Sequence, residues 1–267
     1  MHSTEWGRCG QKHARWKCAG QSGVIRDVEE GACSAADRVI CVSNVLKEEV
    51  QMLYRVPPAK LRTIYNGIHT SQYESALDPG QVKRSLGMDW FNPMVLYVGR
   101  LATQKGPDIL LEAVPAVIQN VTEARFVFVG SGHMLPDLQK RAAALGVGRH
   151  VQFLGAKSGE ELRALQRACD CMVVPSRNEP FGIVVLECWA SGKPVIATTS
   201  GGPREFVADG EEGYLTDPEP GNISAAVVRL FSNWTLVAAM GARGRAKCAA
   251  EFSWDGIAAQ TEAAYAP

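Results

Sequence analysis

The sequence lacks an excess of charge of either sign and lacks a long apolar run. Lys plus Arg equals Asp plus Glu at 28 each in 267 residues, so charge gives no reason to expect a nucleic acid or a membrane surface as partner. No apolar run approaches the roughly 18 residues of a membrane span, and the opening MHSTEWGRCGQKHARWKCAG has no hydrophobic core for a signal peptide. We therefore expect a soluble, cytoplasmic chain without a membrane span.

Paired cysteine motifs are also missing. The eight cysteines are scattered through strand-like and helix-like stretches without a Cys-x-x-Cys spacing. Cys169 and Cys171 flank the start of a predicted strand, where small buried apolar side chains are common. We interpret them as structural thiols, and we predict no metal site and no cofactor.

Two nucleotide-binding fingerprints are incomplete or absent. The turn Gly130-Ser-Gly132 would need a third glycine at position 135 to match a dinucleotide fingerprint, but Leu135 stands there. The Gly-Lys-Ser/Thr pattern of phosphate loops does not occur. These departures disfavour a dehydrogenase and a nucleoside triphosphatase.

A regular alternation of strands and helices begins at Met94. Continuous Val, Ile, Leu and Phe strands separated by helices indicate a parallel sheet covered on both faces, so we predict an α/β, Rossmann-like fold. With 46% hydrophobic residues the chain can bury a sizeable core. The predicted strands are 94–98, 125–129, 150–154, 171–174, 194–198 and 213–216, and the predicted helices are 107–119, 134–145, 159–168, 181–191, 203–208, 223–232, 235–250 and 254–265.

The part before Met94 is less regular. We predict a helix over 25–36, a strand over 38–42, a helix capped by Ser43, and a short strand over 61–66 that ends at the turn Asn66-Gly67. Residues 69–92 lack periodicity and contain Asp78-Pro79-Gly80, so we interpret them as a linker at a domain boundary.

The stretch from Val173 to Val195 contains the strongest functional signal. A buried strand ends at Pro175-Ser176, a polar loop follows, and Gly182 opens a helix. At the carboxyl end of a parallel strand, such a helix start offers free backbone N–H groups to an anion, most often a phosphate. Glu179 in the loop and Glu187 in the apolar helix IVVLECWA could bracket one ligand, although solvated glutamates are the ordinary alternative. A bare carboxylate in such a helix would be costly unless it is bonded, which favours a ligand role for Glu187.

Two further loops follow strands whose carboxyl ends should lie at the same edge. In GRLATQKG, Gly99 lets the chain approach closely, while Arg100 and Lys105 can reach a common anion; a solvated surface pair is the alternative. In GSGHM, a glycine turn precedes the next helix.

These segments together resemble a known family. The chain is similar, over about residues 25–267, to retaining glycosyltransferases of family 4, a GT-B group that includes glycogen and starch synthases. The element E-x7-E with an upstream Arg and Lys is the specific part of this resemblance. The segments that carry it are YVGRLATQKGPDILLEA, VFVGSGHM, VQFLGAKSGEEL, VVPSRNEPFGIVVLECWASGKPVIAT and SGGPREFVADGEEGYL.

The resemblance implies roles for individual residues. Arg100 and Lys105 would hold the donor's diphosphate, Glu179 would contact the transferred hexose, and Glu187 would bond the ribose. His2, in a segment similar to one near the end of the family's first domain, would face the transferred sugar. No metal is demanded, because Arg and Lys neutralise the phosphates and no Asp-x-Asp occurs. The remaining residues of the implied donor site are Gly99, Gly130, Gly132, Arg177, Phe181, Gly182 and Ile183.

The resemblance also implies a domain layout. Residues 1–66 would be the terminal part of the acceptor domain, residues 67–250 the nucleotide-sugar-binding domain, and residues 251–267 a helix that crosses back. Much of the first domain has no counterpart here, so a complementing domain or self-association through exposed apolar patches is expected.

Two functions follow as hypotheses. The first is a retaining hexosyltransferase that moves a hexose, glucose above others, from a UDP-, ADP- or GDP-sugar to a saccharide or another hydroxyl acceptor. The second is a nucleotide-sugar-binding module that holds the donor without transferring it. A phosphorylase is a weaker third candidate, because no lysine can be assigned to a pyridoxal site.

Overall fold

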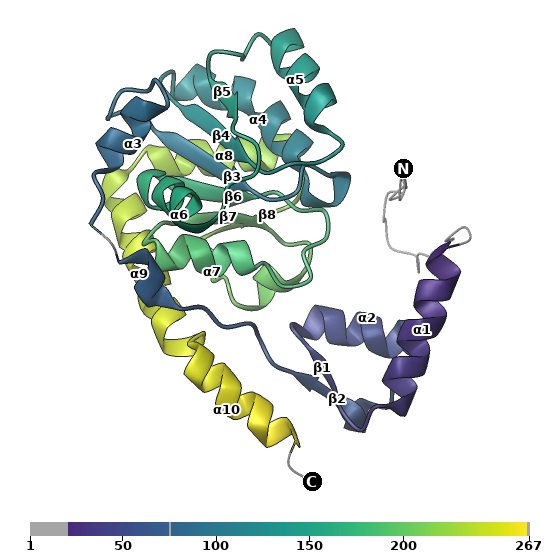
Figure 1. The fold of residues 1–267 in the computed structure, drawn as a ribbon. Helices are drawn as coiled ribbons and strands as arrows, with labels where there is room; N and C mark the ends of the chain where they lie inside the picture. The colour runs from purple at the N-terminus through teal and green to yellow at the C-terminus, as the bar shows by residue number, and fades with distance from the viewer. Residues whose placement is uncertain (1–20, 75, 266–267) are drawn as a thin grey trace.

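The computed structural model describes residues 21–74 and 76–265. Its first part, which we call the N-terminal unit (residues 21–66), contains one parallel pair of strands. Strand β1 (Val39–Cys41) pairs with β2 (Leu61–Thr63), and the helices α1 (Gln21–Ala35) and α2 (Asn44–Tyr54) lie beside them (Figure 1). Ser43 is the N-cap of α2, as predicted, because its hydroxyl accepts a bond from Leu46 N.

The larger part is a six-stranded sheet in which every pairing is parallel. The strand order is β5-β4-β3-β6-β7-β8, so the chain starts in the middle, winds outward in one direction and then returns to wind in the other. This confirms the predicted α/β class. The strands are β3 (Met94–Val98), β4 (Arg125–Val129), β5 (Val151–Phe153), β6 (Cys171–Val174), β7 (Val195–Thr198) and β8 (Gly213–Thr216).

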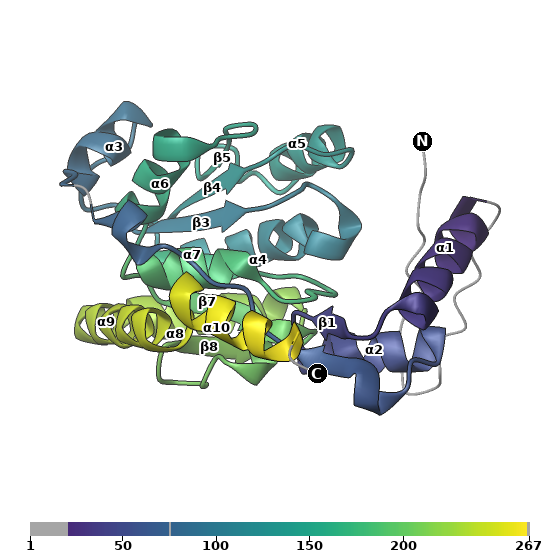
Figure 2. The same ribbon diagram turned by 60° about the horizontal axis from the view of Figure 1, so that its bottom comes forward.

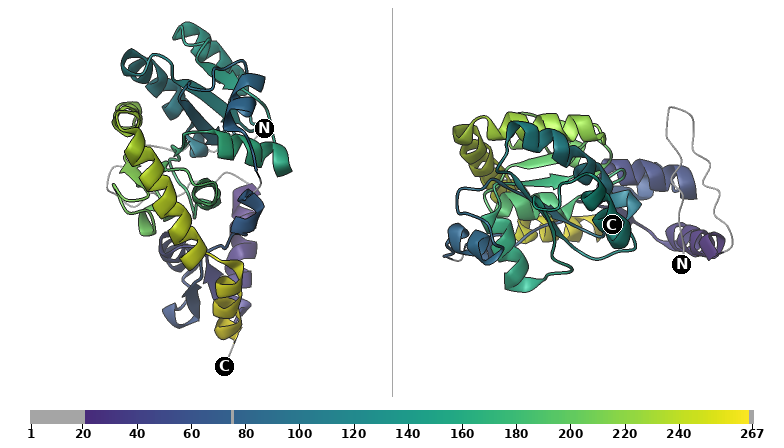
Figure 3. Two further views of the ribbon diagram at one scale, coloured as in Figure 1. Left: turned by 90° about the vertical axis from the view of Figure 1, so that its left-hand side faces the viewer. Right: turned by 90° about the horizontal axis from the view of Figure 1, so that it is seen from above.

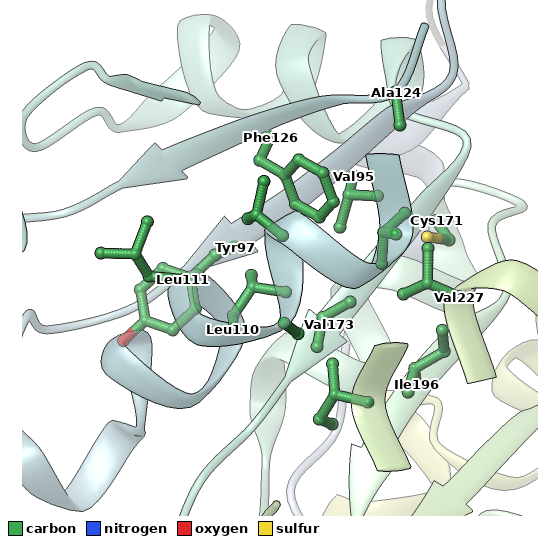
Figure 4. Packing of buried hydrophobic residues seen from close by; sticks show 14 of the residues in the cluster. Val95, Tyr97, Leu110, Leu111, Ala124, Phe126, Cys171, Val173, Ile196 and Val227 are labelled. Atoms are coloured by element: carbon green, nitrogen blue, oxygen red, sulfur yellow. The ribbon is translucent and has the colours of Figure 1, made fainter. Parts of the chain in front are cut away.

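Helices cover both faces of this sheet, and alternate strand residues point to one face or the other. Val95 and Tyr97 of β3 pack in one cluster with α4 (Pro107–Asn120), α5 (Leu135–Ala144) and α8 (Pro220–Phe231). Figure 4 shows both side chains with residues of α4 and α8. Met94 and Leu96 pack with α6 (Gly159–Ala168) and α7 (Ile183–Ala190). Two-sided burial explains why the strands are continuously apolar.

Two predicted local structures are wrong. Residues 69–92 are not a bare linker: they contain a 3-10 turn, η2 (Thr70–Tyr73), and the helix α3 (Pro79–Ser85). Asp78 caps α3 and Pro79 occupies its first turn, so Asp78-Pro79 starts a helix and does not mark a linker. Instead of a helix over 203–208 there is one 3-10 turn, η4 (Gly202–Glu205). Gly202 N donates to Glu179 O in the β6–α7 loop, and Phe206 turns into the core, so the chain does not continue as a helix.

The last two helices run one after the other towards the N-terminal unit (Figures 2 and 3). They are α9 (Trp234–Glu251) and α10 (Trp254–Tyr265). Ile257 and Ala264 of α10 are buried against Ile64, which follows β2. The helix therefore has a packing surface within this chain. The division of the chain at residues 66 and 250 stays a prediction.

Within residues 21–74 and 76–265, no single helix is long and apolar enough to cross a membrane. Helices α8 and α9 reach that length and composition only together, as a pair bent by 103°.

Candidate functional site at the carboxyl edge of the sheet

The order of the strands reverses between β3 and β6, which are neighbours in the sheet. The chain leaves β3 towards β4 on one side of the sheet and leaves β6 towards β7 on the other side, so the loops after β3 and β6 diverge at the carboxyl edge. In open α/β sheets ligands bind at this position. The two flanking loops are 99–106, after β3, and 175–182, after β6. Both were selected from the sequence as carriers of the site.

An ion pair bridges these two loops. Lys105 Nζ lies 2.9 Å from Oε1 and 2.8 Å from Oε2 of Glu179. The Lys105 side chain is 22% exposed and that of Glu179 10%, so the pair is largely shielded from water. The Ser176 hydroxyl donates a third bond to Glu179 Oε2 at 3.0 Å. The residues predicted as phosphate-binding cation and sugar-binding carboxylate therefore meet, with three donor contacts fixing the carboxylate.

Gln104 ties the same loops together through its backbone and its side chain. Its carbonyl oxygen accepts from Arg177 N at 2.8 Å, and its Nε2 donates to Asn178 O at 3.3 Å. Arg100 Nη2 lies 3.4 Å from Gln104 Oε1, and the Arg100 side chain is exposed. Arg100 thus belongs to the loop cluster but stands outside the Lys105–Glu179 pair, with its guanidinium turned to solvent.

Arg177 is engaged in holding the loop in place. Its Nη1 and Nη2 donate to the two carboxylate oxygens of Asp108 at 2.8 and 2.6 Å, and Nη1 also donates to Thr103 O at 2.8 Å. The hydrogen bonds and charge of Asp108 raise the pKa of Arg177, so its guanidinium stays charged and donates two charge-assisted bonds to the carboxylate. Because Asp108 lies in the first turn of α4, the pair anchors the β6 loop to the helix that follows the β3 loop.

The start of α7 faces the same edge. Gly182 precedes the helix with φ +95°, a left-handed conformation that favours glycine. Among the described residues, no protein acceptor receives the backbone N–H of Ile183 or Val184. Free N–H groups and the positive end of the helix dipole suit an anion.

Glu187 has a different partner. Its Oε2 accepts a bond from Gln166 Nε2 at 2.7 Å, and Gln166 is fully buried in α6. Burial raises the pKa of Glu187, and the bond from Gln166 opposes that rise. The expectation that this carboxylate needs a bond is met, but no hydrogen bond in the described part of the chain joins Glu187 to Glu179. Gln166 was missed because no sequence pattern marks it.

Close packing of loops accounts for the predicted glycines. A Cβ on Gly130, whose φ is +142°, would lie 1.9 Å from Gly99 O, and one on Gly132 would lie 2.2 Å from Leu101 O. Leu101 N also donates to Ser131 O at 2.9 Å. These glycines let the loop after β4 lie directly against Gly99 and Leu101 of the loop after β3, which restrains the backbone on both sides of Arg100.

Of the other predicted site residues, His2 lies outside the described residues. Phe181 is buried in an aromatic cluster next to Glu179. Within residues 21–74 and 76–265 no group of His, Cys, Asp and Glu side chains is arranged to hold a metal ion.

Two cavities lie at the opposite edge of the sheet. They measure about 450 and 440 Å³ and share Asp170 and Lys193, which precede β6 and β7. Asp170 is occupied there by structural bonds to Lys83 Nζ and Met94 N, both at 2.7 Å. The convergent ion pair and free helix N–H groups, in contrast, are at the carboxyl edge, which we take as the functional site.

Two family models match the chain. The model described as glycosyl transferases group 1 matches residues 83–247, more than half of the chain. The chain belongs to the group 1 glycosyltransferases. The model described as glycosyltransferase family 4 matches residues 1–72. The six-stranded sheet with its switch point thus falls mainly in the group 1 match, and the N-terminal unit falls in the family 4 match.

Curated relatives of this group 1 glycosyltransferase are longer. An uncharacterized glycosyltransferase of Methanocaldococcus jannaschii is 35% identical over 269 residues, which cover 99% of this chain and 67% of that protein. A D-inositol 3-phosphate glycosyltransferase of Streptomyces avermitilis is 32% identical over 241 residues, which cover 87% of this chain and 52% of that protein. The chain spans about half to two thirds of the length of these relatives.

Solved structures share the arrangement. HepE from Anabaena in complex with UDP has a TM-score of 0.81 and 25% identity, covering 92% of this chain and 68% of that one. The same protein in complex with UDP-glucose has a TM-score of 0.80 and 26% identity, covering 91% and 67%. Sucrose-phosphate synthase from Thermosynechococcus elongatus has a TM-score of 0.79 and 27% identity, covering 94% and 64%. The fold is that of GT-B glycosyltransferases.

Proposed function

We propose that this chain is the donor-binding part of a retaining hexosyltransferase, and that its donor is a UDP-hexose, with UDP-glucose first. The observation that carries the proposal is the Lys105–Glu179 pair, which bridges the two loops at the switch point of the sheet. Complexes of HepE with UDP and UDP-glucose support the choice of nucleotide and sugar. The resemblance to glycogen and starch synthases supports a saccharide as acceptor.

Each side chain and free N–H group of the site binds one part of the donor. The Lys105 ammonium and the N–H groups of Ile183 and Val184 bind the diphosphate, and Arg100 turns from solvent towards it. Glu179, freed in part from Lys105, accepts bonds from hydroxyls of the hexose, and Glu187 accepts bonds from the ribose. As the bond from the anomeric carbon to the diphosphate oxygen breaks, the acceptor oxygen bonds to the same face of that carbon, the acceptor's proton passes to the departing phosphate oxygen, and negative charge builds up on the nucleoside diphosphate. Once the donor is bound, Lys105, Arg100 and the N–H dipoles already face the diphosphate, so they stabilise that charge without further reorganisation during the reaction.

A second candidate is a binding module that holds the nucleotide sugar without transferring it. The observation that favours it is that Lys105, Glu179 and Glu187, the predicted site residues placed at the carboxyl edge, are all contacts to the donor in the family layout. In the family layout the acceptor lies largely on the first domain, so transfer would need groups that a complementing domain supplies. Release of UDP from UDP-glucose in the presence of a glucan acceptor, followed with the purified chain, separates the two: turnover favours the transferase, and binding without turnover favours the module.

Calorimetric titration tests the donor site itself. We expect the chain to bind UDP and UDP-glucose more tightly than ADP-glucose or GDP-mannose. The Lys105→Ala variant should bind UDP at least about tenfold more weakly, because it loses a charged contact to phosphate, and should bind uridine with unchanged affinity. Lys140→Ala, at an exposed position of α5, is the matched control. Equal UDP affinity in all three proteins would refute the proposed phosphate site.

A further inference from the structure

One carboxylate of the larger part holds the N-terminal unit in place. Glu205 ends the turn η4, and its Oε2 accepts from Asn44 N at 2.9 Å and from Asn44 Nδ2 at 3.0 Å. Its Oε1 accepts from Val45 N at 2.7 Å. The hydroxyl of Tyr65 donates to Oε2 at 3.1 Å. Four donors of the N-terminal unit thus converge on a side chain 140 or more positions later in the sequence.

The contact completes the N-terminus of α2. The first N–H groups of a helix have no partner within it. Here Leu46 N donates to the Ser43 hydroxyl and Lys47 N to Ser43 O, while Asn44 N and Val45 N donate to Glu205. A carboxylate at this end of the helix is also favoured by the helix dipole. The helix therefore takes two of its capping acceptors from the other unit of the molecule.

The same contact reaches the loop that carries Glu179. Gly202, in the same turn η4 as Glu205, donates through its N–H to Glu179 O at 2.7 Å, and Glu179 N donates to Ser200 O at 3.0 Å. A Cβ on Gly201 would lie 2.1 Å from Glu179 O, so the two backbones are in close contact. From the other side, the Ser43 hydroxyl donates to Pro180 O at 2.5 Å. The N-terminus of α2 is therefore linked to Pro180 directly through Ser43, and to the backbone of Glu179 through Glu205 and η4.

Aromatic rings also pack between the N-terminal unit and the larger part. The centroid of the Tyr65 ring lies 5.8 Å from that of the Phe181 ring and 6.1 Å from that of the Phe206 ring. Burial, together with the hydrogen bond and charge of Glu205, raises the pKa of Tyr65, so its hydroxyl stays protonated and remains a donor. Displacement of the N-terminal unit would remove Tyr65 from Phe181, the second residue after Glu179.

We propose that Glu205 is a positioning residue that couples the docking of the N-terminal unit to the conformation of the Glu179 loop. When α2 is docked on Glu205, η4 and Pro180 hold Glu179 in reach of Lys105. When α2 leaves, Pro180 loses its bond from Ser43, and η4 loses the bonds that Glu205 makes to α2. Coupling of this kind is reciprocal, so a ligand held by Glu179 and Lys105 strengthens the docking of α2. The ligand arm of this inference rests on the proposed function, whereas its ligand-free arm does not.

Amide hydrogen exchange of the ligand-free chain tests the coupling. In Glu205→Ala we expect the amides of Asn44 and Val45 to exchange at least about tenfold faster, as for the loss of a helix cap. Exchange should also accelerate over residues 176–183, while the strands β3 and β4 stay unchanged. Glu205→Gln, which keeps one acceptor oxygen and loses the charge, should give intermediate rates and serves if the alanine variant fails to fold. Glu262→Gln, at an exposed position of α10, should match the parent.

A nucleotide arm separates coupling from a merely structural contact. Added UDP should slow exchange at Asn44 and Val45 in the parent chain, and in Glu205→Ala it should still bind but leave α2 unaffected. Unchanged α2 exchange in both Glu205 variants would overturn the docking contact, and acceleration confined to α2 would overturn the coupling. If the parent chain binds no UDP, the proposed function fails, and the ligand-free rates over 176–183 still decide the coupling.

Discussion

Glu187 is a carboxylate in a largely apolar helix, and one amide keeps it compatible with that position. Burial raises its pKa, and the 2.7 Å bond from Gln166 favours the charged form. The apolar run around Glu187 predicted that it would need a bond, but the identity of the partner depends on how α6 packs beside α7. That packing joins residues 21 positions apart, and sequence spacing alone does not reveal it.

The effect of Gln166→Leu should depend on pH. Because the folded pKa of Glu187 lies above its unfolded value, its ionisation opposes folding, and its contribution to stability falls as pH rises from the unfolded pKa through the folded one. Removing the Gln166 bond raises the folded pKa further. We therefore expect Gln166→Leu to lower the free energy of unfolding by about 2 kcal/mol at pH 7.5 and by less at pH 5, measured by urea denaturation.

A double variant provides the control for this prediction. In a Glu187→Gln background no charge is present at position 187, so the cost of Gln166→Leu should become the same at both pH values. An equal cost at pH 5 and pH 7.5 in the parent background would show that the bond does not act on the ionisation of Glu187.

At the scale of elements, Gly106 decides how closely the β3 and β6 loops approach. Its φ is +64°, and a Cβ there would lie 2.0 Å from Pro175 O. Gly87 has a similar φ of +72° with nothing within 4 Å of the added atom. Gly87→Ala should cost only the left-handed backbone, about 1 kcal/mol. Gly106→Ala should cost about 2 kcal/mol more through overpacking, and should weaken UDP binding by moving Lys105 away from Glu179.

Thermal or urea denaturation together with UDP titration checks this pair. The two variants share the backbone penalty, so the difference between them reports the contact between the loops. If both glycine variants lose the same stability and bind UDP alike, the close approach of the loops does not position the site.

Long buried elements were predictable, and short ones that depend on distant partners were not. The strands β3, β4 and β6 have the predicted bounds, because each is a mainly apolar run that ends before glycine or proline. Strand β8 also has the predicted bounds, between Gly213 and Asp217, although only half of it is buried. Helix α3 was missed because PGQVKRS has one apolar side chain and therefore shows no helical periodicity, although Asp78 and Pro79 mark its start. Its buried Lys83 is paired at 2.7 Å with Asp170, which lies 87 positions away.

The site shows the same division. Lys105 and Glu179 were selected from their loops, and the structure brings them within 2.9 Å. Their supports, Ser176 and Gln104, are common polar residues in loops whose mutual approach is set by the sheet. Arg177 was selected as a contact for the ligand, yet its guanidinium is held by Asp108, and its proposed role stays untested.

At the scale of the whole molecule, the N-terminal unit is small and presents apolar side chains to solvent. Its buried cluster contains Cys41, Val56 and Leu61, whereas Val24, Ile25 and Val28 of α1 are 65%, 59% and 66% exposed. Such side chains suit a covered surface. A complementing domain or self-association on this face therefore stays a prediction, which sedimentation of the purified chain at several concentrations would test.

We propose that a nucleoside diphosphate binds where the strand order reverses, and a crystal structure of the chain with UDP would reveal its position. We predict the diphosphate oxygens within hydrogen-bond distance of Lys105 Nζ and of the backbone N–H groups of Ile183 and Val184, with the ribose beside Glu187. A nucleotide bound instead at the opposite edge, in the cavities beside Asp170 and Lys193, would refute the proposed nucleotide site at the carboxyl edge.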